Sequence, residues 1–332
     1  MTPRLLVLSL GGTITMVPTA SGAITPMLGA AELVASVPRL ADVAAIEAVS
    51  PLRMASPSLT ISDIIDVARR IESAFAGGID GAVVIQGTDT IEESAFLLDL
   101  LVPGEKPVVV TGAMRGADAP GADGPANLLA AARVAASEDA RGLGTLVVLN
   151  YDIHAARFVQ KSHTALPSAF LSPLSGPLGT VIEGRPRFYV RVVRRRCLAS
   201  ANGPPAPVAL VKVPMGDDTR LIAAVADLGY AGAVIEGMGA GHVHASAAPI
   251  LGDLAARMPV VLASRVMTGP VFTDTYGYPG AEIDLIGRGL IPAGFLSGLS
   301  ARLLLGLLLR TTRDGAPIRE AFAAYGGDAG IA

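Results

Sequence analysis

Two threonine-bearing turns follow two strand-like segments of the chain. Gly11-Gly12-Thr13 comes after the apolar run 5–8, and Gly87-Thr88-Asp89-Thr90 comes after the apolar run 82–85. In open α/β sheets, ligands bind at the edge formed by the carboxyl ends of the parallel strands. If both runs are parallel strands, two hydroxyl groups lie at that edge, and the turns mark a candidate site.

Lysine is rare in this chain and therefore informative. Only three of the 26 basic residues are lysines, at positions 106, 161 and 212. Arginine cannot lose its proton in a protein, whereas a buried lysine can act as a base. Together with the two threonine turns, Lys161 indicates nucleophilic hydroxyl chemistry.

Each turn also has a purely structural explanation. The first turn is compatible with a glycine turn closed by a threonine cap. In the second turn, Thr88 or Asp89 is compatible with the N-cap of a helix. A phosphate site is disfavoured, because the chain has neither G-x-G-x-x-G nor a Walker lysine. Free N–H groups at the start of a helix would hold a negative group, and Asp89 would hold an ammonium group. That pair of contacts suits an α-amino acid.

Composition restricts the class of protein. The 332 residues are 51% hydrophobic and 17% charged, which excludes a disordered chain and allows two domains with sizeable cores. A net charge of −3 provides no electrostatic reason to expect nucleic acid or a membrane as partner. His242-Val243-His244 lacks a Cys, Asp or Glu set at ligand spacing, so no metal site is expected.

Three further segments have alternative interpretations. Cys197 follows a run of three arginines, which could lower its pKa; we expect a thiol without a role rather than a catalytic cysteine. The chain enters strand-like sequence at residue 4 without a signal-peptide pattern, which favours a cytoplasmic protein. Leu290–Leu309 is apolar but is interrupted by Gly, Pro, Ser and Arg, which predicts a turn and a buried helix rather than a membrane span.

The pattern of elements predicts an α/β fold. β-Branched runs alternate with Ala- and Leu-rich helical stretches, which indicates a doubly wound, mainly parallel, flavodoxin-like sheet. Strands are expected at 4–9, 43–49, 81–86, 107–112, 145–150, 208–213, 232–236 and 259–263. Helices are expected at 29–36, 61–76, 90–101, 124–137, 218–228, 245–256 and 299–310. Residues 163–190 are rich in Pro and Gly and are interpreted as loops and short hairpins.

A change of composition predicts the domain boundary. Residues 191–207 combine a basic run with a Pro-rich stretch, as in a semi-rigid spacer. We therefore expect an N-terminal domain over 1–190, a linker over 191–207, and a smaller α/β domain over 208–332. The arginine run is interpreted as a solvated linker face rather than a nucleic-acid patch.

Several short motifs resemble the bacterial-type L-asparaginase family. They occur in the family's order from residue 4 to about 325, and the ordered set is far more specific than any one motif. The matching segments are Leu10–Ile14, Gln86–Thr90, Thr111–Arg115, Ala122–Leu128, Val159–Ser162, Gly176–Gly179, Gly239–His242 and Ala281–Asp284.

This resemblance implies hydrolysis of a side-chain amide through a threonine nucleophile and an acyl-enzyme, without metal or organic cofactor. It implies that Thr13 attacks the amide carbon. Thr88, Asp89 and Lys161 would form a hydrogen-bonded set in which Lys161 is base or proton store. Ser56 matches the serine that contacts the substrate carboxylate, and Asp89 the residue that receives the substrate amino group.

The resemblance also implies a homo-oligomer, a dimer or tetramer, whose sites lie between subunits. Glu282 matches an acidic residue supplied by the neighbour's C-terminal domain, and His242 stands where well-studied members carry Asn. A loop tyrosine of the family is replaced here by Ile24, which cannot relay a proton. We consider Tyr276 or Tyr278 as its replacement; packing or interface contacts are the alternative for both.

The sequence thus favours an asparaginase-type amidohydrolase that converts L-asparagine to L-aspartate and ammonia. Pro57 and His242 both replace polar residues of the family pattern, and altered contacts of this kind can redirect substrate specificity. The alternatives are a related amidase acting on glutamine or another small amide, and a non-catalytic amino-acid-binding homologue.

Overall fold

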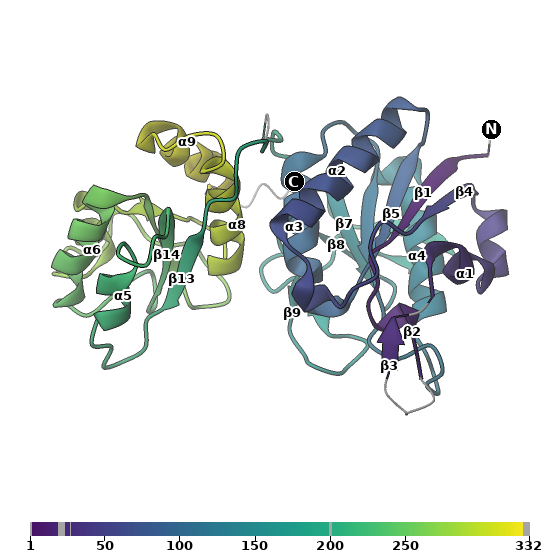
Figure 1. Cartoon of the computed structure of the whole chain (residues 1–332), viewed down its shortest axis with the longest axis horizontal. Helices are drawn as coiled ribbons and strands as arrows, with labels where there is room; N and C mark the ends of the chain where they lie inside the picture. The colour runs from purple at the N-terminus through teal and green to yellow at the C-terminus, as the bar shows by residue number, and fades with distance from the viewer. Residues whose placement is uncertain (1, 19–23, 27, 199–200, 328–332) are drawn as a thin grey trace. The chain divides into compact units, whose positions relative to one another are not determined.

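The computed structural model describes residues 2–18, 24–26, 28–198 and 201–327. The chain forms two compact units, one up to Cys197 and the other from Leu198 onward (Figure 1). Each unit has its own sheet and its own core, so each is described by itself. Among the described residues, no helix is both long and apolar enough to cross a membrane.

Unit 1 is built on an eight-stranded sheet with the order β12-β11-β8-β7-β6-β5-β1-β4. Neighbouring strands from β4 to β7 run parallel, and β8, β11 and β12 extend the sheet with antiparallel pairs. The strands are β1 (Arg4–Ser9), β4 (Ala45–Val49), β5 (Gly81–Ile85), β6 (Val108–Thr111), β7 (Thr145–Leu149), β8 (Asp152–Ala155), β11 (Gly179–Ile182) and β12 (Arg185–Phe188). Two small hairpins pair β2 (Met16–Pro18) with β3 (Ile24–Pro26) and β9 (Gln160–Lys161) with β10 (Phe170–Leu171).

Helices cover both faces of this sheet (Figure 1). They are α1 (Ala30–Ala35), α2 (Ile61–Ala76), α3 (Ile91–Leu101) and α4 (Gly124–Ala135). Helices α2 and α3 pack together, whereas α4 lies with α1 on the opposite face. The connections from β5 to β6 and from β6 to β7 advance in the same direction across the sheet. Helix α3 of the first connection and helix α4 of the second lie on opposite faces of the sheet. The β6–α4–β7 crossover therefore has the opposite hand to the β5–α3–β6 crossover, although crossovers within one parallel sheet usually share the right-handed form.

Local sequence explains the best-defined elements of unit 1. Helix α2 begins at a capping box, in which the Thr60 hydroxyl accepts from the Asp63 N–H and the Asp63 carboxylate accepts from the Thr60 N–H. Its residues Ile64, Ile65 and Ile71 are buried at helical spacing. All residues of β5 are buried, as expected for a central strand covered on both faces.

Unit 2 is a smaller α/β layer structure. Its parallel strands follow the order β13-β14-β15-β16, with α5 and α6 packed together and α8 packed on β13, β14 and β15. The strands are β13 (Val208–Lys212), β14 (Gly232–Gly237), β15 (Val260–Ser264) and β16 (Ile291–Pro292). The helices are α5 (Arg220–Ala224), α6 (Ala247–Arg257), α7 (Glu282–Gly287), α8 (Gly298–Leu308) and α9 (Gly315–Gly326).

The predicted α/β class and the mainly parallel sheet are confirmed, and most predicted elements are present within two residues of their observed ends. The apolar stretch Leu290–Leu309 is a short strand followed by the buried helix α8, as predicted. The helix expected over 218–228 is shorter at both ends: α5 begins after Thr219, whose φ of 64° is incompatible with a helix interior, and residues 225–228 form turns. Helices α7 and α9 were not expected.

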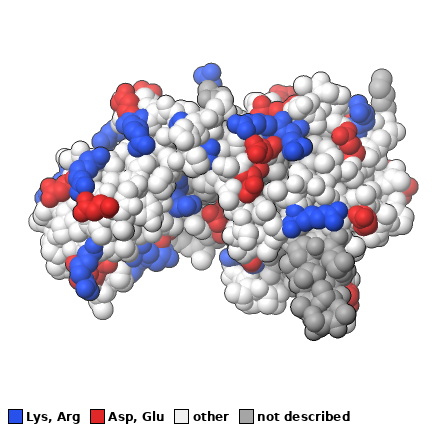
Figure 2. All heavy atoms as spheres, viewed as in Figure 1, with Lys and Arg blue, Asp and Glu red and all other residues white. Residues whose placement is uncertain are grey.

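Charged side chains are mixed on the surface. On the face drawn in Figure 2, acidic and basic groups lie next to one another. Exposed pairs such as Arg69 with Asp66 and Arg257 with Asp227 belong to this pattern. This agrees with the small net charge of −3.

Candidate functional site

The two threonine turns meet at the carboxyl edge of the large sheet. Strands β1 and β5 are neighbours, and the turn after each strand is in van der Waals contact with the other. Gly12 has φ = 93°, and a Cβ built on it would lie 2.1 Å from the Gly87 nitrogen. A side chain at Gly12 would therefore collide with the backbone of the second turn.

Ser56 lies against the same turn from a third segment. It begins the short helix η3 (Ser56–Ser58) and is buried. Its Oγ would lie 2.6 Å from a Cβ built on Gly87. The Thr90 hydroxyl donates to its carbonyl oxygen at 3.2 Å. Residues 12, 56 and 87 thus come together although they are far apart in the sequence.

Lys161 joins Thr88 and Asp89 by direct hydrogen bonds. Its Nζ donates to Thr88 Oγ1 at 2.9 Å and to Asp89 Oδ1 at 2.5 Å. The lysine side chain is 15% exposed and the Asp89 side chain 59%. A single side-chain nitrogen therefore connects a buried hydroxyl to a carboxylate that faces solvent.

Glu92 holds Lys161 from the backbone side, and sequence reasoning missed it. Its Oε2 accepts the Lys161 N–H at 3.1 Å. Burial raises the pKa of Glu92, an effect that the Lys161 N–H only partly offsets. An acidic residue in the first turn of α3 is explained by the helix dipole alone, so the sequence carried no signal for this contact.

Thr13 and Thr15 share one turn but differ in environment. Thr15 is fully buried, and its hydroxyl donates to the Gly12 carbonyl at 2.7 Å. Thr13, the first residue of η1 (Thr13–Thr15), is only partly buried. Of these two hydroxyls, the one on Thr13 is therefore the one accessible to a ligand.

Asp123 and Asn127 have a structural role, because their side chains hold the turn after β6. Asp123 accepts the backbone N–H groups of Met114 and Arg115. Asn127 donates to the Gly112 carbonyl and accepts the Asn150 N–H. These bonds fix the turn after β6, which lies against the Thr88 turn, because a Cβ on Gly112 would lie 3.3 Å from Thr88 Cγ2.

Unit 2 contains a separate hydrogen-bonded set at the carboxyl end of β14. His242 Nε2 lies 3.0 Å from Glu282 Oε2, and His242 Nδ1 lies 2.9 Å from the Tyr278 hydroxyl. Glu282 Oε1 accepts the N–H groups of Thr275 and Tyr276, at 3.0 and 2.6 Å. The two residues predicted in this domain, His242 and Glu282, are therefore in direct contact.

Glu282 keeps its charge although its side chain is fully buried. Burial raises the pKa, but the hydrogen bonds from Tyr276, Thr275 and His242 outweigh it and hold the pKa of Glu282 below its usual value. A carboxylate with several donors is stabilised in its ionised form even away from water.

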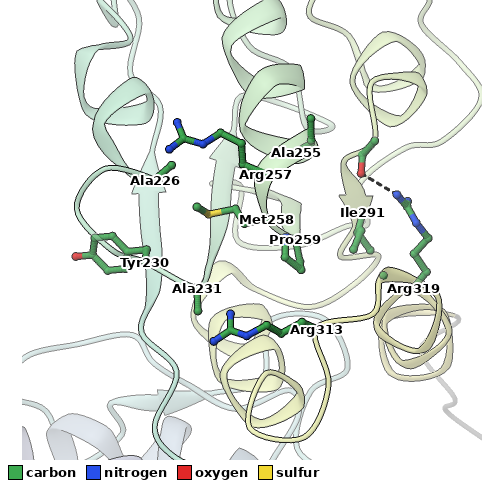
Figure 3. A pocket seen from close by; sticks show the side chains of 13 residues that line it. Ala226, Tyr230, Ala231, Ala255, Arg257, Met258, Pro259, Ile291, Arg313 and Arg319 are labelled. Atoms are coloured by element: carbon green, nitrogen blue, oxygen red, sulfur yellow. Dashed lines mark hydrogen bonds between the residues drawn. The ribbon is translucent and has the colours of Figure 1, made fainter.

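A cavity of about 470 Å³ lies at the opposite edge of the unit 2 sheet. It opens at the amino ends of β14, β15 and β16, beside Ala231, Pro259 and Ile291 (Figure 3). Two of the arginines around it have partners within the unit: Arg257 pairs with Asp227, and Arg319 donates to the Gly289 carbonyl. The cavity is therefore distinct from the His242–Glu282 set.

The neighbouring arginines do not lower the pKa of Cys197. Burial raises the pKa of this thiol, and the guanidinium of Arg194 does not reverse the effect. The thiol lies within 3.5 Å of the Asp99 and Val102 carbonyls. It is not an activated nucleophile.

The fold and the cluster define a two-domain α/β protein with a hydroxyl–lysine–carboxylate site. Residues 4–194 match the family domain "Asparaginase, N-terminal", and residues 207–322 match "Glutaminase/Asparaginase C-terminal domain". The chain belongs to the bacterial-type L-asparaginase family.

Similar proteins match over nearly the whole chain. A probable L-asparaginase of Deinococcus radiodurans is 37% identical, over 96% of this chain and 97% of that protein. A glutaminase-asparaginase of Pseudomonas fluorescens is 32% identical, over 90% of this chain and 83% of that protein. The crystal structure of a probable cytoplasmic L-asparaginase from Campylobacter jejuni has a TM-score of 0.85 at 32% identity, over 97% of this chain and 100% of that chain.

Proposed function

We propose that this protein is an amidohydrolase that converts L-asparagine to L-aspartate and ammonia. The observation that carries the proposal is the position of Lys161 Nζ, within hydrogen-bond distance of both Thr88 Oγ1 and Asp89 Oδ1. This cluster adjoins the glycine turn that presents Thr13. Family membership and the names of the similar proteins support the same reaction.

In the proposed mechanism, the Thr13 oxygen attacks the side-chain amide carbon. A threonine hydroxyl is a weak nucleophile and needs an adjacent base. Its proton passes to the set formed by Thr88 and Lys161, while Asp89 orients the lysine. Backbone N–H groups of the two glycine turns stabilise the oxyanion, at about 3–4 kcal/mol per donor in comparable sites.

The tetrahedral intermediate then collapses. The C–N bond breaks, the nitrogen takes up a proton and leaves as ammonia, and an aspartyl ester remains on Thr13. Water, activated by the same Thr88–Lys161 set, cleaves this ester and restores the hydroxyl. Ser56 contacts the substrate carboxylate, and Asp89 receives its amino group.

Glutamine is the second candidate substrate. One of the similar proteins carries the name glutaminase-asparaginase, and both Pro57 and His242 depart from the family pattern. Ammonia release from asparagine, glutamine and other small amides distinguishes the two. We expect turnover of asparagine by the wild type and its loss in Thr13→Ala. Binding without turnover by the wild type would instead favour an amino-acid-binding homologue.

We further propose a homo-oligomer in which Glu282 and His242 complete a neighbouring subunit's site. Co-expression of Lys161→Met with His242→Ala tests this arrangement. Each variant alone is inactive or nearly so, but a mixed dimer contains one site made of two intact halves and regains about half of wild-type activity. If mixed dimers gain nothing, the site lies within one chain. The cytoplasmic location expected from the sequence stays a prediction.

A further inference from the structure

The cavity at the amino ends of β14, β15 and β16 is lined by charges of one sign. Three of the described residues that line it are arginines, and none is Asp or Glu. In the whole chain, by contrast, 29 acidic residues outnumber 26 basic ones, and the two signs are mixed on the face in Figure 2. Arginine keeps its charge because it cannot be deprotonated in a protein. The wall of this cavity therefore attracts anions.

The donors of these arginines are only partly used within unit 2. Arg257 pairs with Asp227 at 2.9 Å, and Arg319 donates to the Gly289 carbonyl at 2.9 Å. Arg313 is exposed, and no described residue forms a hydrogen bond or an ion pair with its side chain. A guanidinium group has five N–H donors, so all three arginines have donors left for a ligand.

Apart from the arginines, the side chains that line the cavity are apolar or aromatic. In Figure 3, Met258 and Ala231 lie between Arg257 above and Arg313 below. Both guanidinium groups extend toward the side of the view on which Tyr230 stands, 37% exposed. The volume of about 470 Å³ lies within the range of small-molecule sites, about 300–1,000 Å³.

We propose that this cavity binds a small organic phosphate that carries a flat ring system, the chemistry of a mononucleotide. Arg257 and Arg313 hold the phosphate oxygens, because a planar guanidinium group donates two parallel hydrogen bonds to such a group. The ring lies on the apolar wall beside Tyr230, because bases stack on aromatic side chains. This site is separate from the proposed hydrolysis of asparagine and does not depend on it.

Structural roles explain two of the three arginines but not the third. Arg257 ends α6, where the helix dipole favours a cation, and Arg319 fixes the Gly289 carbonyl. Arg313 has neither role, and its charge is repelled by the other two. A bound phosphate removes this repulsion. A dicarboxylate would also do so, but it has no ring to cover Tyr230 and the apolar wall.

Methyl NMR of the full-length protein tests whether the cavity is occupied. Met258 lines the cavity, whereas Met215 lies beyond the carboxyl end of β13 and is 90% exposed. Both ¹³C-methyl signals can be assigned by replacing each methionine with leucine. AMP should shift the Met258 signal and leave the Met215 signal in place. An unchanged Met258 signal would overturn the proposal. Absence of ammonia release would overturn the proposed function alone, because this measurement does not depend on turnover.

Titration of the Met258 shift then measures Kd for four ligands. AMP should bind more tightly than inorganic phosphate or adenosine, because each of these supplies only one part of the ligand. Succinate is the control for a dicarboxylate and should bind more weakly than AMP. Equal affinity for AMP and inorganic phosphate, or tighter binding of succinate, would overturn the proposed ligand class.

Variants separate the contribution of charge from that of the ring. Arg313→Gln should weaken AMP binding about tenfold, the effect of one hydrogen bond to a charged group. Tyr230→Leu should also weaken AMP about tenfold but leave inorganic phosphate within about twofold. Arg220→Gln is the matched control, since Arg220 is exposed, pairs with Asp218 and lies outside the cavity. Equal losses in Arg313→Gln and Arg220→Gln would overturn the assignment.

Discussion

The polar clusters of the two units are arranged in opposite order. In unit 1 the hydroxyl of Thr88 is buried and the carboxylate of Asp89 is 59% exposed. In unit 2 the carboxylate of Glu282 is fully buried and the hydroxyl-bearing Tyr278 is 49% exposed. The first cluster presents a charge to a ligand, whereas the second presents a hydroxyl backed by a charge.

A partly buried glutamate, Glu92, and a fully buried one, Glu282, differ in the direction of their pKa shift. Glu92 accepts one backbone N–H, and burial raises its pKa. Glu282 accepts two backbone N–H groups and faces His242, and its pKa is lowered. Hydrogen bonds to the ionised form can therefore offset the effect of burial on the pKa of a carboxylate.

The largest expected effect is a loss of activity when a lysine of unit 1 is replaced, compared with a lysine of unit 2. Lys161→Met removes the nitrogen that connects Thr88 and Asp89, so kcat for asparagine should fall about 10³-fold, within the range for a general base. Lys212→Met is the matched control, since Lys212 is exposed and pairs with Glu236. Activity of Lys161→Met near that of the control would contradict the assigned role.

The next effect concerns how unit 1 brings its threonines together. Gly12→Ala places a Cβ against the Gly87 backbone at a φ of 93°, and it should destabilise the fold by at least about 3 kcal/mol. Gly104→Ala has a similar φ of 89° but no atom within 4 Å of its Cβ. It should cost about 1 kcal/mol. Urea unfolding compares the two, and equal losses would show that the close approach is unimportant.

The buried imidazole of His154 makes the stability of the fold depend on pH. Burial lowers the pKa of His154 from 6.5 to about 4. Between these values the unfolded chain binds a proton that the folded chain does not, so stability falls as the pH drops from 6.5 to 4, by about 3 kcal/mol. His154→Gln should remove this part of the pH dependence in urea unfolding at pH 7 and pH 5. An unchanged slope would assign it to other groups.

The smallest effect contrasts the two carboxylates directly. Glu282→Gln replaces a buried charge-assisted acceptor and should lower stability by about 2 kcal/mol. Asp89→Asn changes an exposed ion pair and should cost less than about 1 kcal/mol, although it should reduce activity more strongly. Thermal unfolding of both variants checks the order. The reverse order would mean that burial is not what distinguishes the two carboxylates.

The sequence predicted elements with strong local signals. Helix α2 has a capping box and periodic isoleucines, and its predicted range of 61–76 agrees with the structure at both ends. Helix α5 was overestimated at both ends, because Thr219 adopts a φ of 64° and residues 225–228 form turns. Local signals were therefore sufficient for elements such as α2, but not for α5, α7 and α9.

The site was only partly accessible from the sequence. Motif resemblance indicated Thr88, Asp89 and Lys161, which the fold brings into contact across more than 70 residues. The contact of Glu92 with a backbone N–H has no residue-type signature. The burial of Glu282 depends on the packing of a whole unit, so the sequence did not show that the carboxylate faces inward.

The central claim is that Thr13, served by the Thr88–Lys161 set, forms a covalent intermediate with the substrate. Rapid acid quenching of the wild type with asparagine, followed by peptide mass mapping, tests it directly. We predict an added aspartyl group on the peptide that contains Thr13, absent from Thr13→Ala. An aspartyl group on the Thr88 peptide, or steady ammonia release with no covalent species at any time point, would contradict the account.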